Sequence, residues 1–153
     1  MMQQALQTAW AEVVQPLLQR PKLLQVAALC TRGTGGNKKV LLVTSRGSQR
    51  WILPKGWLMD GKTAAEAAVQ EAWEEAGVIT STVPTTSIGH YSYKKMLDSG
   101  VVAACEAEVF PLEVHEIAKA FPEKGQRKRK WLSPKNAAKL VSEPKLKEIL
   151  RQL

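Results

Sequence analysis

Residues 56–78 read GWLMDGKTAAEAAVQEAWEEAGV, a loop followed by a segment rich in Ala and Glu. Thr63 is a preferred N-cap residue, and Glu66 three positions later completes a capping-box pattern. Gly77 follows the segment and is typical of the left-handed residue that ends a helix. The pattern predicts a helix over residues 64–76, whose small alanines suit close packing against a sheet.

Three glutamates of this predicted helix share one face. Glu71, Glu74 and Glu75 stand at positions i, i+3 and i+4, so their carboxylates lie close together and repel one another. A divalent cation would convert this repulsion into binding, and carboxylate oxygens suit hard cations such as Mg²⁺ or Mn²⁺. A solvated acidic face is the alternative interpretation. We favour a metal site because an acidic patch is out of character in a chain of net charge +8.

The segment resembles the Nudix box, a loop–helix–loop motif that begins with Gly, carries Arg-Glu and then Glu-Glu on its helix, and closes on Gly. In this chain Gly56 fills the first glycine and Glu71 the Glu that follows the arginine. Glu74 and Glu75 fill the Glu pair, and Gly77 closes the motif. The resemblance implies an α/β fold, a Nudix-like α/β/α sandwich with a mixed β-sheet between helices.

Two positions of the box differ from the family pattern. Lys62 stands where the family has its first Glu, and Gln70 stands where it has Arg. In the family these two residues support the loop and helix through contacts with each other and with the metal-binding glutamates. The joint replacement leaves two interpretations open. We favour an active enzyme on a variant scaffold, and the alternative is a nucleotide- or polyphosphate-binding module with weakened catalysis.

The resemblance implies a hydrolase in which water attacks a phosphorus of a pyrophosphate linkage with the help of bound metal. It implies Glu71 and Glu75 as the principal ligands of Mg²⁺ (or Mn²⁺), with Glu74 as a third or water-mediated ligand. A main-chain carbonyl near Lys55 or Gly56 would complete the shell. The same three glutamates are therefore the expected catalytic residues.

The general base stays open between two places in the sequence. Within the box, Glu74 or Glu75 could accept the proton. On a later predicted strand, Glu106 and Glu108 are further candidates, although we favour an exposed strand face for both of them.

Segments on either side of the box resemble the Nudix branch that cleaves diphosphoinositol polyphosphates and diadenosine polyphosphates. Residues 50–54 (RWILP) precede the box, and residues 127–132 (RKRKWL) follow it. The resemblance implies a substrate of one of these two kinds first, while nucleoside triphosphates and nucleotide sugars, which share the pyrophosphate linkage, stay open. Removal of pyrophosphate from an RNA 5′ end is the alternative that the basic charge permits, although the run at 127–130 lacks interleaved aromatic residues.

Binding of a polyphosphate needs cations beyond the metal, and arginine suits bidentate contacts with phosphate. Several basic residues flank the box loop, end the first two predicted strands or belong to the basic run. Each of these residues alone is equally well explained as an ordinary surface cation, whereas together they could attract and bind a polyanion. The candidate substrate-binding residues are Arg32, Arg46, Arg50, Lys55, Arg127 and Arg129.

Among the aromatic residues, Trp57 in the box loop is the better candidate for substrate contact, with a hydrophobic anchor as the alternative. Tyr91 and Tyr93 alternate along a predicted strand, and we expect them to pack rather than to stack on an adenine. His90 and His115 have no carboxylate or cysteine partner at useful spacing, so we expect both to be structural or exposed.

The rest of the chain predicts strands around the central helix and further helices late in the sequence. After a loop at residues 119–128, helices are expected from Pro134 and from Pro144, because proline suits the first helical turn. We expect residues 21–153 to form one domain, preceded by an N-terminal arm or helix over residues 1–20. The predicted strands or extended pieces are residues 23–32, 38–45, 50–54, 87–94 and 101–110.

The composition limits the expected cellular compartment and the chemical class of the binding partner. The two cysteines, Cys30 and Cys105, lie in apolar runs and are expected to be buried free thiols. No apolar run is long enough to span a bilayer and the first residues do not resemble a secretory signal, so we expect a cytoplasmic protein. The basic charge favours an anionic partner, for which we expect a polyphosphorylated small molecule before a nucleic acid, and no membrane. The oligomeric state stays open.

Overall fold

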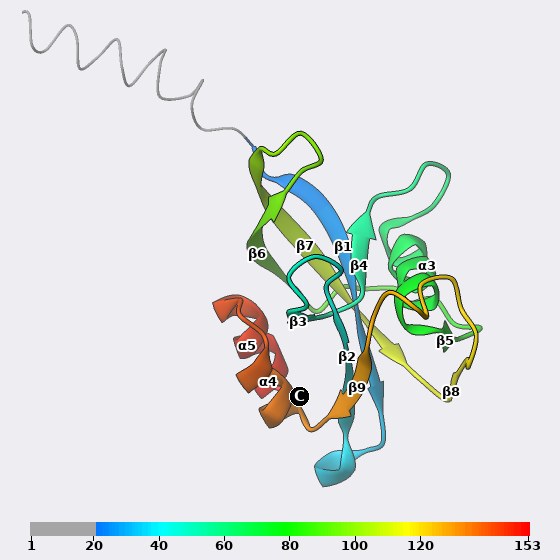
Figure 1. Cartoon of the computed structure of the whole chain (residues 1–153). Coiled ribbons are helices and arrows are strands. Elements are labelled where there is room, and N and C mark those ends of the chain that lie inside the picture. Colours follow the sequence, from blue (N-terminus) through cyan, green and yellow to red (C-terminus); the bar gives the residue numbers. More distant parts are fainter. Residues whose placement is uncertain (1–20) are drawn as a thin grey trace, which may run out of the picture.

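A mixed sheet of seven strands forms the centre of the computed structural model, which describes residues 21–153 (Figure 1). The arm or helix expected over residues 1–20 lies outside the described residues. The strand order is β3-β2-β1-β7-β6, while β4 pairs with β1 and β9 pairs with β2. The seven strands are β1 (Leu23–Arg32), β2 (Lys39–Thr44), β3 (Trp51–Ile52), β4 (Lys55–Trp57), β6 (Gly89–Met96), β7 (Val102–Glu113) and β9 (Arg129–Leu132).

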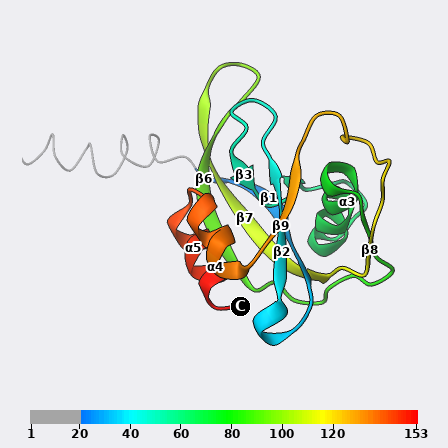
Figure 2. The ribbon, with the colours of Figure 1, turned by 60° about the horizontal axis from the view of Figure 1, so that its bottom comes forward.

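Helices cover both faces of this sheet. α3 (Ala64–Ala76) lies on one face, and α4 (Pro134–Leu140) with α5 (Pro144–Arg151) lies on the other (Figures 1 and 2). A short 3-10 turn, η2 (Gly35–Asn37), connects β1 to β2, and a small second sheet pairs β5 (Val78–Ile79) with β8 (Glu116–Ile117). The arrangement confirms the expected α/β/α sandwich. Within residues 21–153, no helix is long and apolar enough to cross a membrane.

The apolar run of β1 is buried on both faces of the sheet. Val26, Ala28 and Cys30 belong to the core cluster beneath α3, whereas Ala27 and Leu29 belong to the cluster beneath α4 and α5. Successive strand side chains point to opposite faces, so a strand covered on both sides needs apolar residues at every position. The continuous run in the sequence therefore reflects the two helical layers.

β1 is also the strand at which the sheet becomes mixed. It runs parallel to β7 and antiparallel to both β2 and β4. Thr31 and Arg32 pair with β2, while Gln25–Ala27 pair with Lys55–Trp57 of β4. Residues 55–57 were expected in a loop, and this expectation is wrong, since their backbone completes the edge of β1. The pairing holds the start of the box against the sheet.

The helix predicted from the box is confirmed at both ends. Thr63 Oγ1 accepts a hydrogen bond from the Glu66 amide at 3.1 Å, and Glu66 Oε1 accepts one from the Thr63 amide at 2.9 Å. Gly77 closes the helix in the left-handed region at φ 70°. The buried alanines that let the helix lie close to the sheet are Ala65, Ala67, Ala68, Ala72 and Ala76.

His90 has a carboxylate partner, contrary to the prediction from spacing. Antiparallel pairing of β6 with β7 sets His90 opposite Glu108, and Nε2 lies 3.4 Å from the carboxylate Oε2. His115 lies 3.9 Å from Glu113 Oε1. Both histidines are exposed, as expected. The His90 partner is invisible in the sequence because only strand pairing brings the two residues together.

Both cysteines are buried free thiols, which confirms the prediction. Cys30 lies on the α3 side of β1, and burial raises the pKa of its thiol to about 12. A thiol in this environment is a packing group, since the reactive thiolate form is strongly disfavoured.

Candidate functional site

A cavity of ≈ 750 Å³ opens between α3, β4, β6 and two loops that contain residues 45–50 and 123–127. It is lined by two groups of charged side chains. We call the first group the acidic wall, and its residues are Glu71, Glu74, Glu75 and Glu123. We call the second group the basic wall, and its residues are Arg46, Arg50, Lys55, Lys94 and Lys95.

The acidic wall begins on α3, where the helical spacing places the three box glutamates toward the cavity. Glu71 is 9% exposed and Glu75 is 4% exposed, while Glu74 is half-buried. β4 passes directly over Glu71, and a Cβ added at Gly56 would lie 2.2 Å from Glu71 Oε1. Gly56 therefore leaves room for the Glu71 carboxylate, which a larger residue at this position would displace.

Burial of these carboxylates changes their titration. Desolvation, followed by a hydrogen bond and repulsion from Glu75, raises the pKa of Glu71 to about 8. Desolvation also raises the pKa of Glu75, and the nearby Arg127 guanidinium opposes that effect. The two groups resist ionising together, which is the electrostatic condition that a divalent cation relieves.

The acidic wall fits a hard divalent cation by its chemistry, since all its donors are carboxylate oxygens. Across residues 21–153, however, no three His, Cys, Asp or Glu side chains already surround one point suited to an ion. Glu74 Oε1 instead accepts a hydrogen bond from Gln70 Nε2 at 2.9 Å, and Glu75 lies beside Arg127. The carboxylates that would hold a cation are thus close together. Glu74 and Glu75 would have to turn away from Gln70 and Arg127 to bind it.

Glu123 is a fourth carboxylate that the sequence interpretation missed. Its backbone amide donates to the Glu74 carbonyl at 2.9 Å, which ties the loop after β8 to the end of α3. Its side chain lines the cavity and is 18% exposed. The available signal was a lone acidic residue in the basic segment 119–130. Its position beside Glu75 depends on the path of the loop, which the sequence does not indicate.

Lys55 joins the two walls. Its backbone amide donates to Glu75 Oε1 at 3.4 Å, and its Nζ lies 4.7 Å from the centroid of the Tyr93 ring. Desolvation lowers the pKa of its ammonium group to about 8, although Glu75 opposes the shift. Tyr93 lines the cavity and its buried hydroxyl has no partner among the described residues, while Tyr91 is buried in the core, as expected.

The rest of the basic wall is more exposed. The side chain of Arg46 is 64% exposed and that of Arg50 is 43% exposed, with Arg50 Nη1 lying 3.5 Å from the buried Glu143. Lys94 and Lys95 come from β6 and were missed, because nothing in the sequence places this strand beside the box loop. Lys95 Nζ lies 6.0 Å from the ring centroid of Trp57, which is 42% exposed and lines the cavity.

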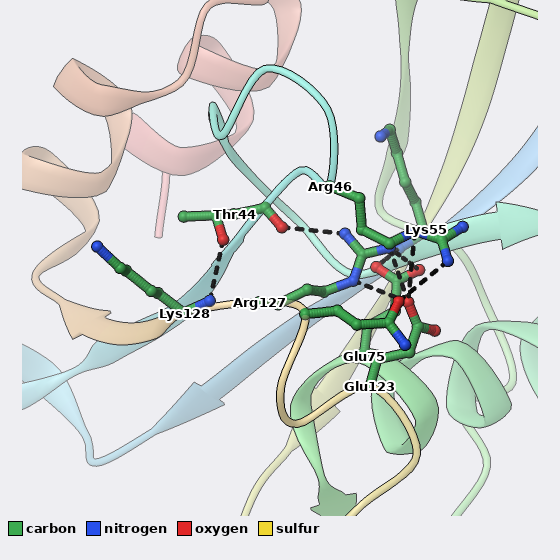
Figure 3. A network of polar contacts seen from close by, with 8 residues as sticks. Thr44, Arg46, Lys55, Glu75, Glu123, Arg127 and Lys128 are labelled. Carbon is green, nitrogen blue, oxygen red and sulfur yellow. Dashed lines mark hydrogen bonds and ion pairs between the residues drawn. The ribbon is translucent and has the colours of Figure 1, made fainter.

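Arg127 lies at the junction of the acidic wall with the sheet (Figure 3). Its Nε and Nη2 each lie 3.0 Å from Glu123 Oε1, and Nη2 lies 3.7 Å from Glu75 Oε2. Its Nη1 donates to the Thr44 carbonyl at 3.0 Å. The side chain is 8% exposed. Of the expected phosphate ligands, this residue has the most internal partners.

Arg127 lines the cavity, whereas two of the expected phosphate ligands, Arg32 and Arg129, do not. The Arg32 guanidinium lies over Trp131, 4.1 Å from the ring centroid. Arg129 donates to the Ala76 carbonyl at 2.7 Å and lies over Phe121 at 4.6 Å. Carbonyls at the end of a helix have no partner within the helix, and Arg129 supplies one for α3. Both residues therefore serve packing and helix capping here.

Glu106 and Glu108, the alternative general bases, are also absent from the lining of the cavity. Glu106 lies opposite Ser92 and Glu108 opposite His90 in the β6–β7 pair, and both side chains are half-buried. Lys62, which replaces the first box Glu, is exposed at the start of α3. It is among the causes that lower the pKa of Glu66, after the hydrogen bonds from Thr63.

Solved structures resemble the whole fold. The crystal structure of a C. elegans Ap4A hydrolase binary complex superposes with a TM-score of 0.62 at 20% identity, covering 85% of this chain and 93% of that one. The MutT protein from Methanosarcina mazei Go1 superposes with a TM-score of 0.63 at 22% identity, covering 88% and 94%. At these identities the likeness concerns the fold.

Proteins with similar sequences include named Nudix hydrolases. Nudix hydrolase 12, mitochondrial, from Arabidopsis thaliana is 35% identical over 104 residues, covering 67% of this chain and 51% of the relative. The human diphosphoinositol polyphosphate phosphohydrolase 3-alpha is 39% identical over 54 residues, covering 35% of this chain and 33% of that protein. The chain spans about half the length of the first two plant relatives. The NUDIX domain model matches residues 22–153, and the chain therefore belongs to the Nudix family.

Proposed function

We propose that the protein is a Mg²⁺- or Mn²⁺-dependent pyrophosphohydrolase that cleaves a polyphosphorylated small molecule. The observation that carries this proposal is the pairing of an acidic wall with a basic wall in one cavity. A polyphosphate needs both, because cations hold its charge while carboxylates hold the metal. When bound, the metal would polarise phosphate oxygens and lower the pKa of a bound water.

The residues of the acidic wall have separate proposed roles. Glu71 and Glu75 are the principal metal ligands, since they are the most buried and their mutual repulsion is greatest. Glu74 is the third ligand or the general base, because its contact with Gln70 is a single hydrogen bond from an uncharged amide, which a cation can replace. Glu123 is a further ligand contributed by the loop. The Gly56 carbonyl remains a proposed main-chain ligand.

The basic wall supports a substrate with several phosphates. Arg46 and Arg50 present guanidinium groups to the cavity, and Lys94 and Lys95 add point charges from β6. Diadenosine polyphosphates and diphosphoinositol polyphosphates are our first candidates, because an Ap4A hydrolase has a similar fold and a diphosphoinositol polyphosphate phosphohydrolase is a sequence relative. Only the first kind carries a base that the exposed Trp57 could stack against.

The test is a hydrolysis screen with Mg²⁺ or Mn²⁺ over diadenosine tetraphosphate, a diphosphoinositol pentakisphosphate, ADP-ribose and a 5′-triphosphorylated RNA. Parent protein is compared with Glu75→Gln and with the matched surface variant Glu148→Gln. We expect Glu75→Gln to lose at least ~100-fold in kcat, because a metal contributes several kcal/mol to the reaction. Glu148→Gln should match the parent, since its side chain is 60% exposed on α5.

Each outcome of this screen has one meaning. Equal turnover by parent and Glu75→Gln would reject the assigned site. Metal-dependent binding without turnover of any of the four compounds would make the chain a binding module, and cleavage of the RNA alone would make it an RNA 5′-pyrophosphohydrolase. In a separate binding measurement, loss of diadenosine tetraphosphate affinity in Trp57→Ala, with diphosphoinositol affinity unchanged, would show that Trp57 contacts the base.

The cellular location is a separate proposal. We keep the cytoplasm as the expected compartment, while the plant relatives include proteins named as mitochondrial and chloroplastic. Fractionation of cells that express the full chain with a C-terminal tag tests it, and recovery in an organelle would overturn it.

A further inference from the structure

Arg127 contacts three separate parts of the chain at once. It lies on the loop before β9, yet its side chain contacts Glu123 in the same loop, Glu75 on α3 and the Thr44 carbonyl at the end of β2 (Figure 3). All three guanidinium nitrogens are within 3.0 Å of an oxygen. These contacts involve all three nitrogens but not all five N–H donors of Arg127, which also lines the cavity, so protein oxygens fix the position of the guanidinium.

The backbone around Arg127 is fixed by the same end of β2. The Lys128 amide donates to Thr44 Oγ1 at 2.9 Å, and the Thr44 amide donates to the Lys128 carbonyl at 3.0 Å. Thr44 thus holds the loop at three points, two through Lys128 and one through Arg127. The Arg127 guanidinium is therefore fixed to the end of β2 by its hydrogen bond to the Thr44 carbonyl, independently of its contacts with the two carboxylates.

The geometry differs sharply from that of Arg46, the other arginine near Glu123. Arg46 Nε lies 3.8 Å from Glu123 Oε1 and its side chain is 64% exposed, whereas the Arg127 side chain is 8% exposed. Arg46 can therefore leave Glu123 for a ligand without uncovering a buried charge. Arg127 cannot, because the buried Glu75 and the half-buried Glu123 would lose their nearest cation.

The box itself provides no cation at this place. Gln70 is an uncharged amide that donates to Glu74, and Lys62 is exposed at the far end of α3. Besides Lys55, the cation that pairs with Glu75 comes from a residue that follows it by more than fifty positions in the sequence. Loop and helix are joined by the Arg127–Glu75 ion pair at 3.7 Å, while the same forked guanidinium donates hydrogen bonds to Glu123 and to the Thr44 carbonyl.

We propose that Arg127 is a positioning residue, which is anchored on Thr44 and holds Glu123 beside Glu75 so that the acidic wall is complete. This proposal rests on the proposed function for its catalytic consequence. It assigns Arg127 a role different from the phosphate ligand expected from the sequence. Its basis is directed geometry, so a lysine at this position, with one ammonium group on a flexible stem, will not replace it.

The experiment compares the parent full chain with Arg127→Lys, Arg127→Gln and the matched control Arg151→Gln, whose side chain is exposed at the end of α5. The first readout is amide hydrogen exchange in EDTA. We expect the Glu123 and Lys128 amides to exchange at least tenfold faster in both Arg127 variants, because these amides hold the loop to α3 and β2. Exchange within α3 should be unchanged, which separates local release from global unfolding.

The second readout is binding of Mn²⁺ alone, followed calorimetrically. Both Arg127 variants should bind Mn²⁺ at least fivefold more weakly than the parent and the control. The third readout is steady-state hydrolysis, in which kcat should fall at least tenfold while KM stays within threefold. The lysine variant should be nearly as impaired as the glutamine variant.

Several results would overturn the proposal. Unchanged amide exchange, or tighter Mn²⁺ binding in Arg127→Gln, would show that Arg127 merely competes for the carboxylates. A rise in KM with unchanged kcat would make Arg127 a substrate ligand, and full activity in Arg127→Lys would show that charge alone suffices. If the parent hydrolyses nothing, the proposed function fails, yet exchange and Mn²⁺ binding still decide the role of Arg127.

Discussion

The two walls of the cavity differ in origin and in burial. Three of the four residues of the acidic wall come from two turns of one helix, and Glu71 and Glu75 are almost fully buried. The basic wall comes from the loop at 45–50, β4 and β6, and its arginines remain substantially exposed. Buried charges keep a fixed geometry and act on the reaction, whereas exposed cations mainly attract the substrate and are screened by salt. The four predictions below test this division.

Loss of one buried carboxylate should have the largest effect. We expect Glu71→Gln to lower kcat by ~10³-fold with little change in KM, because it removes a proposed metal ligand from a desolvated site. Steady-state kinetics at saturating Mn²⁺ will measure it, with Glu148→Gln as control. A change confined to KM would show that Glu71 contributes to substrate binding rather than to the chemical step, and the proposed difference between the two walls would be wrong.

Crowding the same carboxylate should have the next largest effect. In Gly56→Ala the new Cβ would lie 2.2 Å from Glu71 Oε1, so the carboxylate must move. Because the displaced atoms end a side chain, we expect kcat to fall about 30-fold while the melting temperature changes little. The matched control is Gly36→Ala, whose Cβ would meet no atom within 4 Å. Parent-like kinetics in Gly56→Ala would show that this approach does not position Glu71.

The basic wall should respond through binding. Replacing both Lys94 and Lys95 by Gln should raise KM about tenfold and leave kcat nearly unchanged, since exposed ion pairs are worth about 0.2–1 kcal/mol each. The effect should shrink as salt is raised from 0.05 to about 0.5 M, where charges are screened. Lys119→Gln and Lys139→Gln together provide a charge-matched control. A loss of kcat that salt does not affect would contradict the assigned role.

The smallest effect concerns stability without metal. The pKa of Glu71 is raised from 4.5 to about 8 in the folded protein, so the folded state binds more protons than the unfolded state between these values. This contribution is complete below pH 4.5 and is lost as the pH rises through about 8. In EDTA we expect the free energy of unfolding of the parent, relative to that of Glu71→Gln, to fall as the pH rises from 5 to 8. Urea unfolding measures it, and a rise would refute the raised pKa.

The fold was largely predictable because its signals are local. The capping box at Thr63 and the glycine at 77 define α3 by hydrogen bonds within one turn, and the run at 23–32 is a strand with both faces covered. β4 was missed because three residues carry no periodic pattern, and their extended form depends on pairing with β1. The cation contacts of Arg32 and Arg129 were equally unpredictable, since both depend on packing between distant segments.

The sequence by itself determined the elements that helical periodicity and capping control: the helix of the box, the common face of Glu71, Glu74 and Glu75, and the glycines that flank them. Tertiary structure alone decided which distant residues complete the cavity. Glu123, Arg127 and the lysines of β6 arrive there through a parallel pairing of β1 with β7 and through a loop tied to Thr44. The physical reason is range, because a helix places side chains by bonds spanning four residues, while a sheet brings together residues that only the whole chain can align.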